Sequence, residues 1–409
     1  MSTKERVKLM FTEQQLKMMF LRAVTTVTFY RGKPPVDFLQ ERVKKILELN
    51  PWLTGDLVKL PTGEIVIEFE RSNSININWN FSVMTSNTIK SSDSYSTLSS
   101  KISKMKHVCV PTGFTCLNRK IPLYYVMLII NPEANEYAFT ASLSHVLGDG
   151  YTFYALYRML GINETPSEMI YKRDLEFEAQ RAAVVGHTHA FWESPEIAAG
   201  YILSVIRTVF VWIILHLILR QPSYRISSID EEWVQHQKKL YNKEKSYISS
   251  NDAITSWFFK LVDCDIGVMA MNLRTRVVNI GKKHAGNYDE VILYQRPDFE
   301  TPQLIRQSLT GQKFKRVVTG EMSRWNVFKF NVGLVTNWAS FYQDVDFESS
   351  TQIYHVPVIP DVAMELAYCV VFCPKKGSLA VITSNSSIFN PHSGNPLIPF
   401  TYQGMMEEV

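Results

Sequence analysis

A histidine followed four residues later by an aspartate and a glycine is the arrangement in this sequence best suited to chemistry. The run reads Ser144-His145-Val146-Leu147-Gly148-Asp149-Gly150. An imidazole titrates near neutral pH, so His145 is the natural group to take a proton from a hydroxyl. We expect Gly150 to relieve the turn sterically. The alternative is a surface turn in which Asp149 only caps the next helix, and the pattern alone gives the two interpretations equal weight.

Apolar patterning places this run between a strand and a helix. Strands are predicted at residues 124–130 and 137–143, with a turn between them, and a helix at residues 151–160. The end of a strand is a rigid mount, and the turn after it can present His145 to a cleft.

The same kind of pattern predicts elements along the rest of the chain. A helix is expected at residues 36–49, ended by Asn50-Pro51, and another after the cap signal Ser249-Ser250-Asn251-Asp252. The polar stretch 72–101 is expected to be a loop. Further strands are predicted at residues 64–69, 291–293, 334–338, 368–373 and 378–382. This mixture of strands and helices predicts an α/β (α+β) protein with mixed sheets flanked by helices.

Composition excludes several classes of protein. The 409 residues are enough for two domains, and 46% hydrophobic content is typical of a globular chain. A net charge of +4 is too balanced to indicate nucleic-acid binding. The five cysteines form no metal-binding spacing, so we expect free thiols and no metal. The first ten residues lack an apolar signal core, which argues against secretion.

Other segments strengthen the functional interpretation of His145. The sequence resembles the His-x-x-x-Asp-Gly acyltransferases, the superfamily of chloramphenicol acetyltransferase, nonribosomal condensation domains and the plant BAHD enzymes, and is most similar to the BAHD group. The resemblance covers most of the chain, with its landmarks in the family's order. They are Asn50-Pro51-Trp52-Leu53-Thr54-Gly55, the segment from Ser249 to Trp257, Asn272-Leu273-Arg274-Thr275-Arg276 followed by Gly286-Asn287, the segment from Val335 to Phe341, and Asp346-Phe347.

Two departures from the family pattern indicate a divergent branch. Glu348-Ser349-Ser350 stands where the family has Gly-Trp-Gly, and Ser144 replaces the first histidine of the common His-His pair. His145 and Asp149 are intact.

The resemblance implies a fold and a mechanism. It implies two chloramphenicol-acetyltransferase-like domains with an active-site channel between them. His145 would deprotonate the acceptor, which then attacks the thioester of an acyl-CoA directly, with no covalent enzyme intermediate. Asp149 would be structural and would pair with Arg274. Acyl-CoA is thus expected as a co-substrate, with no permanently bound cofactor.

Two further sets of residues are candidates for binding. The developing oxyanion needs a donor, and the candidates are Thr336, Asn337 and Trp338, although Trp338 also fits a core position. Coenzyme A phosphates need basic residues, although each of these basic runs also fits a solvated face. The basic candidates are Lys282, Lys283, Lys313, Lys315 and Arg316.

One apolar segment, from Ile197 to Leu219, stands out. Its 23 residues would span about 35 Å as a helix, long enough to cross a bilayer. His145 precedes it and Arg274 follows it, so a single crossing would separate parts of one site. We therefore expect a helix lying in one leaflet, the alternative being a buried core helix or a partner interface.

Together these observations predict an acyl-CoA-dependent acyltransferase acting on an alcohol or amine acceptor, and a membrane-seated segment suggests either an apolar acceptor or a fatty acyl donor. The expected division is an N-terminal domain at 1–190, a membrane-associated crossover at 191–222 and a C-terminal domain at 223–409. We expect a monomer in the cytoplasm or on the cytoplasmic side of an intracellular membrane. The alternatives are a wax-ester or diacylglycerol-type synthase, an alcohol acetyltransferase, a carrier-protein-dependent condensation enzyme, and an inactive lipid- or partner-binding relic of the fold.

Overall fold

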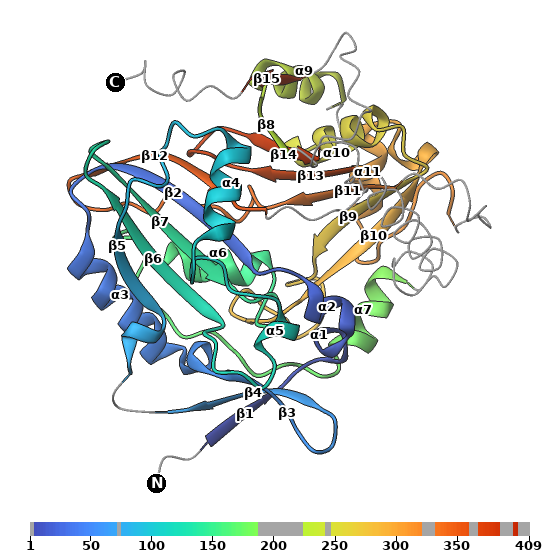
Figure 1. Cartoon of the computed structure of the whole chain (residues 1–409). Helices are drawn as coiled ribbons and strands as arrows, with labels where there is room; N and C mark the ends of the chain where they lie inside the picture. The colour runs from blue at the N-terminus through green and yellow to red at the C-terminus, as the bar shows by residue number, and fades with distance from the viewer. Residues whose placement is uncertain are drawn as a thin grey trace, which may run out of the picture.

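A computed structural model shows two large sheets and one small sheet (Figure 1). It describes residues 4–71, 75–186, 224–241, 247–320, 332–359, 367–384 and 396–399. The small sheet has the order β1-β4-β3 and lies near the N-terminus; its strands are β1 (Lys4–Lys8), β3 (Asp56–Lys59) and β4 (Ile65–Glu70).

The first large sheet holds the strand that leads to His145. Its strands are β2 (Val24–Gly32), β5 (Phe81–Thr85), β6 (Tyr124–Asn131), β7 (Glu136–Leu143) and β12 (Ser350–Pro357). They are ordered β12-β2-β7-β6-β5. The hairpin of β6 and β7 runs in register from Tyr124 opposite Leu143 to Asn131 opposite Glu136. Every residue of β7 is buried, which makes this strand a rigid support for the His145 turn.

The second large sheet is built from the C-terminal half of the chain. Its strands are β8 (Tyr224–Ile229), β9 (Ile266–Asn272), β10 (Asp289–Gln295), β11 (Val332–Asn337), β13 (Ala367–Phe372), β14 (Ala380–Ser384) and β15 (Leu397–Pro399). They are ordered β10-β9-β11-β13-β14-β8-β15. β11 pairs in parallel with both β9 and β13. β12 belongs to the C-terminal half of the chain but pairs with β2 of the first large sheet, so it links the two large sheets.

Helices cover the sheets and lie between them. The α-helices are α1 (Phe11–Gln14), α2 (Leu16–Phe20), α3 (Val36–Leu49), α4 (Tyr95–Lys104), α5 (Gly113–Cys116), α6 (Gly150–Arg158), α7 (Phe177–Val185), α9 (Glu231–Tyr241), α10 (Ser250–Leu261) and α11 (Pro302–Leu309); short 3₁₀ helices are η1 (Pro51–Thr54), η2 (Ile77–Trp79) and η4 (Arg296–Phe299). From α6, Tyr154 contacts the ring of Trp338, just after β11, and bonds to His355 of β12. The helix after His145 thus contacts elements of both large sheets.

Local sequence explains the elements that were predicted correctly. α3 buries Leu39, Val43, Ile46 and Leu47 on one face and ends before Pro51, as its spacing predicts. α10 begins with a capping box, in which Ser249 accepts from the backbone of Asp252 and the Asp252 carboxylate accepts from the backbone of Ser249. The predicted α/β class with mixed sheets is therefore confirmed.

The loop predicted at 72–101 is wrong at residues 81–85 and 95–101, whereas residues 86–94 form no helix or strand. Residues 81–85 form β5, which pairs in parallel with β6, and α4 begins at Tyr95. Tyr95, Leu98 and Ile102 of α4 are buried in the core. Packing of these few apolar side chains outweighs the turn preference of the serines and asparagines around them.

The apolar segment from Ile197 to Leu219 lies outside the described residues, and so do the expected domain boundaries near 190 and 222. Within the described part of the chain, no helix combines the length and apolarity needed to cross a bilayer.

Candidate active site

The turn that carries His145 is fixed at both ends. Ser144 donates its backbone N–H to the carbonyl of Leu123, 2.8 Å away, and Leu147 bonds back to Ser144 at 2.9 Å. Asp149 is the N-cap of α6 and accepts from the backbone N–H of Thr152 at 2.9 Å. We predicted that Gly150 relieves steric crowding in the turn, but the glycine that does so is Gly148. A Cβ on Gly148 would come within 2.6 Å of the Thr152 side chain, whereas one on Gly150 would meet nothing closer than 3.5 Å.

Asn287 determines which nitrogen of His145 carries the proton. The Asn287 amide nitrogen donates to the His145 carbonyl at 2.8 Å and to Glu13 Oε1 at 3.1 Å. Its Oδ1 therefore faces His145 Nδ1, 3.1 Å away, and can only accept. Nδ1 must then be the protonated nitrogen, which leaves the Nε2 lone pair without a hydrogen-bond partner in the described structure. A neutral imidazole in this tautomer can act as a base through Nε2.

The environment keeps the imidazole uncharged. Burial lowers the pKa of His145 below its ordinary value of 6.5, while Asp149, the histidine's own carbonyl and Asn287 oppose that shift. The unprotonated form is therefore the main one at neutral pH. This is the protonation state that a general base requires.

Glu13 and Arg173 hold Asn287 in place, and sequence reasoning missed both. Arg173 Nε lies 3.1 and 3.0 Å from the two Glu13 oxygens, and both side chains are fully buried. Arg173 also donates to the carbonyls of Leu147 and Ala285, at each end of the site. Glu13 accepts from the backbone N–H of Asn287 at 3.0 Å. Separations of more than 100 residues leave no local signal of this network.

Replacing Asn287 tests its role as a positioning residue. Asn287→Leu should lower kcat roughly 10- to 100-fold, because the ring loses the contact that orients it. The Asn287 contact raises the His145 pKa, so the acid limb of the pH–rate profile should also move to lower pH. Steady-state kinetics across pH would measure both effects.

Asn131→Leu is the matched control, because Asn131 is also buried but bonds to Ile89 at the far end of the β6–β7 hairpin. It should lower the melting temperature without moving the pH profile. An unshifted profile in Asn287→Leu would contradict the positioning role.

Arg274 and Asp149 form a buried ion pair beneath the histidine turn. Arg274 Nη1 lies 2.6 Å from Asp149 Oδ2 and Nη2 lies 3.2 Å from Oδ1, and both side chains are almost fully buried. The guanidinium also donates to Thr152 Oγ1 and to the carbonyls of Gly286 and His284. Asp149 thus caps α6 and pairs with Arg274 at once. The connection between β9 and β10 is thereby tied to the His145 turn.

Gly286 is required for this connection to pass Arg173. Its φ is +137°, and a Cβ there would come within 2.9 Å of Arg173 Nε.

The oxyanion candidates line a small cavity beside Asp149. The cavity has a volume of about 40 Å³, and its walls include Thr336, Asn337 and Trp338. The amide of Asn337 is engaged, since it donates to Asn251 and accepts from the backbone of Ser340. Thr336 and Trp338 show no hydrogen bond from their side chains within the described structure. The side chains of these two are therefore free to donate to a ligand, whereas Asn337 is held in place by its own hydrogen bonds.

The basic candidates fall in two different places. Lys282 and Lys283 are exposed on the turn that leads to Asn287. Lys313 and Lys315 are exposed after α11. Arg316 is fully buried and donates to the carbonyls of Gly320 and Leu293. The prediction that Arg316 contacts a coenzyme A phosphate is therefore wrong, because its guanidinium is buried and donates to backbone carbonyls. Arg316 is an internal structural residue.

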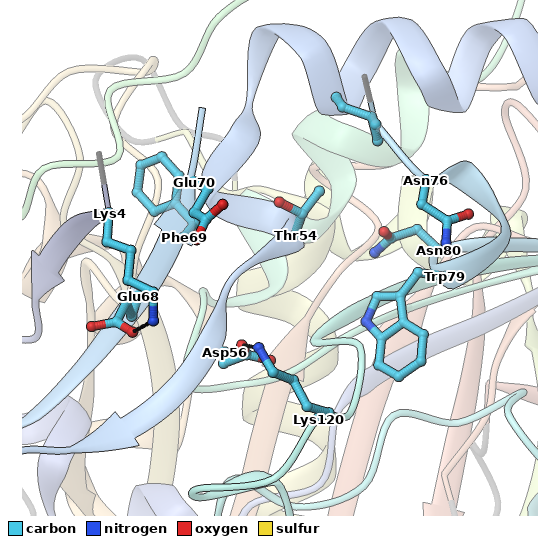
Figure 2. A pocket seen from close by; sticks show the side chains of 11 residues that line it. Lys4, Thr54, Asp56, Glu68, Phe69, Glu70, Asn76, Trp79, Asn80 and Lys120 are labelled. Atoms are coloured by element: carbon cyan, nitrogen blue, oxygen red, sulfur yellow. Dashed lines mark hydrogen bonds and ion pairs between the residues drawn. The ribbon is translucent and has the colours of Figure 1, made fainter. Parts of the chain in front are cut away.

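A larger cavity of about 320 Å³ lies on the small sheet (Figure 2). None of the residues predicted to act in catalysis lines it. Its charged groups pair with one another, Lys4 with Glu68 and Lys120 with Asp56. Figure 2 shows the Lys4–Glu68 pair on the opposite side from Trp79 and Asn80, with Asp56 and Lys120 between them.

The cysteines do not form a second catalytic centre. All five are unpaired, as predicted. Burial raises the pKa of Cys109 and of Cys116 to about 11, so both are neutral thiols at physiological pH.

Comparison with known proteins places the fold. No family model matches the sequence, and no curated protein matches it. TRI101 from F. graminearum complexed with ethyl coenzyme A has a similar structure, with a TM-score of 0.61 and 12% identity over 94% of this chain and 96% of that chain. Polyketide synthase associated protein 5 from Mycobacterium tuberculosis gives a TM-score of 0.54 and 12% identity over 95% and 93% of the two chains.

A third similar structure is the first condensation domain of the CDA synthetase, with a TM-score of 0.54 and 10% identity over 95% of this chain and 92% of that chain. At such low identity these matches establish the fold alone. The chain has the two-domain fold of the chloramphenicol-acetyltransferase type, and the fold that the sequence resemblance predicted is confirmed.

Proposed function

We propose that this protein transfers an acyl group from acyl-CoA to a hydroxyl or amine, with His145 as general base. The observation that carries the proposal is the contact of His145 Nδ1 with Asn287, which implies a tautomer whose Nε2 has no hydrogen-bond partner among the described residues. Support comes from the fold, since TRI101, which shares it, binds ethyl coenzyme A.

The residues of the site fit a direct transfer. His145 Nε2 takes the proton of the acceptor as its oxygen or nitrogen attacks the thioester carbonyl. Thr336 Oγ1 and Trp338 Nε1 are the proposed donors to the oxyanion. When the C–S bond breaks, the proton on Nε2 passes to the departing CoA sulfur. No side chain forms a covalent bond with the acyl group.

Lys282 and Lys283 are the proposed contacts for the coenzyme A phosphates. They lie on the same connection as Asn287, a few residues before it in the sequence. Ammonium groups on an exposed turn can approach phosphates without losing a structural partner. Lys313 and Lys315 are the second choice.

Release of free thiol from acyl-CoA tests the proposal. Purified protein should release coenzyme A from acetyl-CoA or a longer acyl-CoA only when an alcohol or amine acceptor is present. An acyl product should accumulate in equal amount. Thiol release that ignores the acceptor would indicate a hydrolase, and binding of acyl-CoA without turnover would favour the inactive relic.

The apolar segment from Ile197 to Leu219 is proposed to seat the protein on one face of a membrane. Its length and apolarity carry this proposal. Deleting the segment should move the protein from the membrane pellet to the supernatant after cell fractionation. An unchanged distribution would favour a buried helix or a partner interface.

A further inference from the structure

Among the described residues no close ion pair holds the Asp289 carboxylate, although Arg274 lies near enough to lower its pKa. Asp289 opens β10, opposite Asn272 of β9, and lines the cavity of about 40 Å³ together with Asp149. The nearby cation, Arg274, is already held by both oxygens of Asp149. Asn272 also turns its oxygen to Arg274, at 3.2 Å. When Asp289 is ionised, this corner of the site therefore carries one negative charge in excess.

Aromatic side chains also line this cavity. Tyr151 and Phe341 meet edge to face with centroids 5.4 Å apart, and Trp338 lies beside them in the lining. Arg274 already sits 4.5 Å from the centre of the Tyr151 ring, so the local geometry brings a cation against a ring face. Aromatic faces next to a carboxylate attract a small organic cation.

Burial supports the same interpretation. Removal from water, and next the Asp149 carboxylate, raise the pKa of Asp289 above its ordinary value. A cation bound in the cavity would offset both effects.

Asp289 is close in sequence to Asn287, the residue that contacts the proposed base His145. Asn287, which contacts His145, and Asp289 are two residues apart as the chain enters β10. The cavity is also lined by Thr336 and Trp338, the proposed oxyanion donors. An acceptor whose ammonium sits at Asp289 would thus place its other end beside the proposed oxyanion donors.

We propose that the Asp289 cavity is a subsite for an ammonium group on the acyl acceptor. This inference rests on the proposed acyl transfer, and it names the acceptor class as a short diamine or amino alcohol. One ammonium stays charged against Asp289, and the other end supplies the nucleophile. The cavity volume suits a terminal ammonium and excludes a bulky head group.

The step balances without a further reactant. The neutral amine or hydroxyl at the far end forms a C–N or C–O bond with the thioester carbonyl as the C–S bond breaks. Its proton passes to His145 Nε2 and then to the CoA sulfur. The ammonium at Asp289 keeps its protons throughout.

Acceptor competition in wild type and in Asp289→Asn tests the subsite. The acceptors are an α,ω-diamine with a butane chain and n-pentylamine, in which a methyl group replaces one ammonium. Wild type should prefer the diamine in kcat/KM, and Asp289→Asn should lose roughly 10- to 100-fold of that preference, mainly through a higher KM for the diamine. Equal preference in the two proteins would overturn the proposal.

Calorimetric binding of the diamine without acyl-CoA separates this inference from the proposed function. Wild type should show binding that Asp289→Asn lacks, even if neither protein turns over. Asparagine matches aspartate in size, and because burial raises the pKa of Asp289 to about 8 the carboxyl is largely uncharged at neutral pH without a cation, so the variant should melt no lower than wild type. Asp263→Asn is the matched control, because Asp263 is 74% exposed and has a positive φ that asparagine tolerates. Diamine binding that is equal in wild type and Asp289→Asn would place the ammonium elsewhere.

Discussion

His145→Ala is expected to lower acyl transfer by roughly 10²- to 10⁴-fold, the usual contribution of a general base. The loss should appear in kcat, with KM for acyl-CoA little changed, because the ring acts on the acceptor proton. The structure gives the reason: Asn287 fixes the Nδ1–H tautomer and leaves Nε2 as the base. Steady-state assays of acceptor acylation would measure the loss.

The pH dependence is set by the direction of the pKa shift. Burial lowers the pKa of His145 below 6.5, so the active, neutral imidazole persists to lower pH than a free histidine would allow. The kcat/KM of wild type should therefore rise with pH through a midpoint below 6.5 and then level off. A rate that falls as pH rises through that midpoint would mean that His145 acts as an acid.

His236→Ala is the control for this experiment. His236 lies on the exposed side of α9 and takes no part in the site. The activity and melting temperature of the His236→Ala variant should equal those of wild type. Turnover by His145→Ala at the level of His236→Ala would remove the general-base mechanism.

Local patterns were sufficient for the elements around His145 and insufficient elsewhere. The buried β6–β7 hairpin is visible as two largely apolar runs with a turn between them, and the cap of α6 is visible as a single aspartate. β5 and α4 were missed because they lie in a stretch rich in Ser, Thr and Asn, while a few buried side chains decide the structure. A pattern of residue types reports local preference, and burial by distant segments can override it.

The residues of the site also fall into those that the sequence reveals and those that only the fold reveals. His145 stands out by type and spacing, while Arg274, 125 residues from Asp149, could be placed only through resemblance to a family. Glu13 and Arg173 had neither signal, because each is an ordinary charged residue until the fold buries both. Asp289 likewise becomes notable only because Asp149 and Asn272 already satisfy Arg274.

Breaking the Asp149–Arg274 pair should have the largest effect on stability. Asp149→Asn keeps a side chain that can cap α6, so it isolates the loss of charge. It leaves a buried guanidinium facing an amide, and one-sided removal of a buried pair costs about 3–5 kcal/mol. Arg274→Met should cost a similar amount, because it leaves the carboxylate buried. Urea denaturation would measure the free energy of unfolding of each variant.

The double variant decides whether the two side chains act as a unit. Each single change leaves the partner's charge buried and unpaired. The combined change should therefore destabilise the protein less than the sum of the two single changes, with a coupling of about 1–3 kcal/mol. Asp263 and Arg296 form the control pair, since they are 74% and 49% exposed and should couple by no more than about 1 kcal/mol. Activity should show the same pattern, because Arg274 ties the β9–β10 connection, and with it Asn287, to the His145 turn. Simple additivity of the two changes in kcat would show that the pair does not position the histidine.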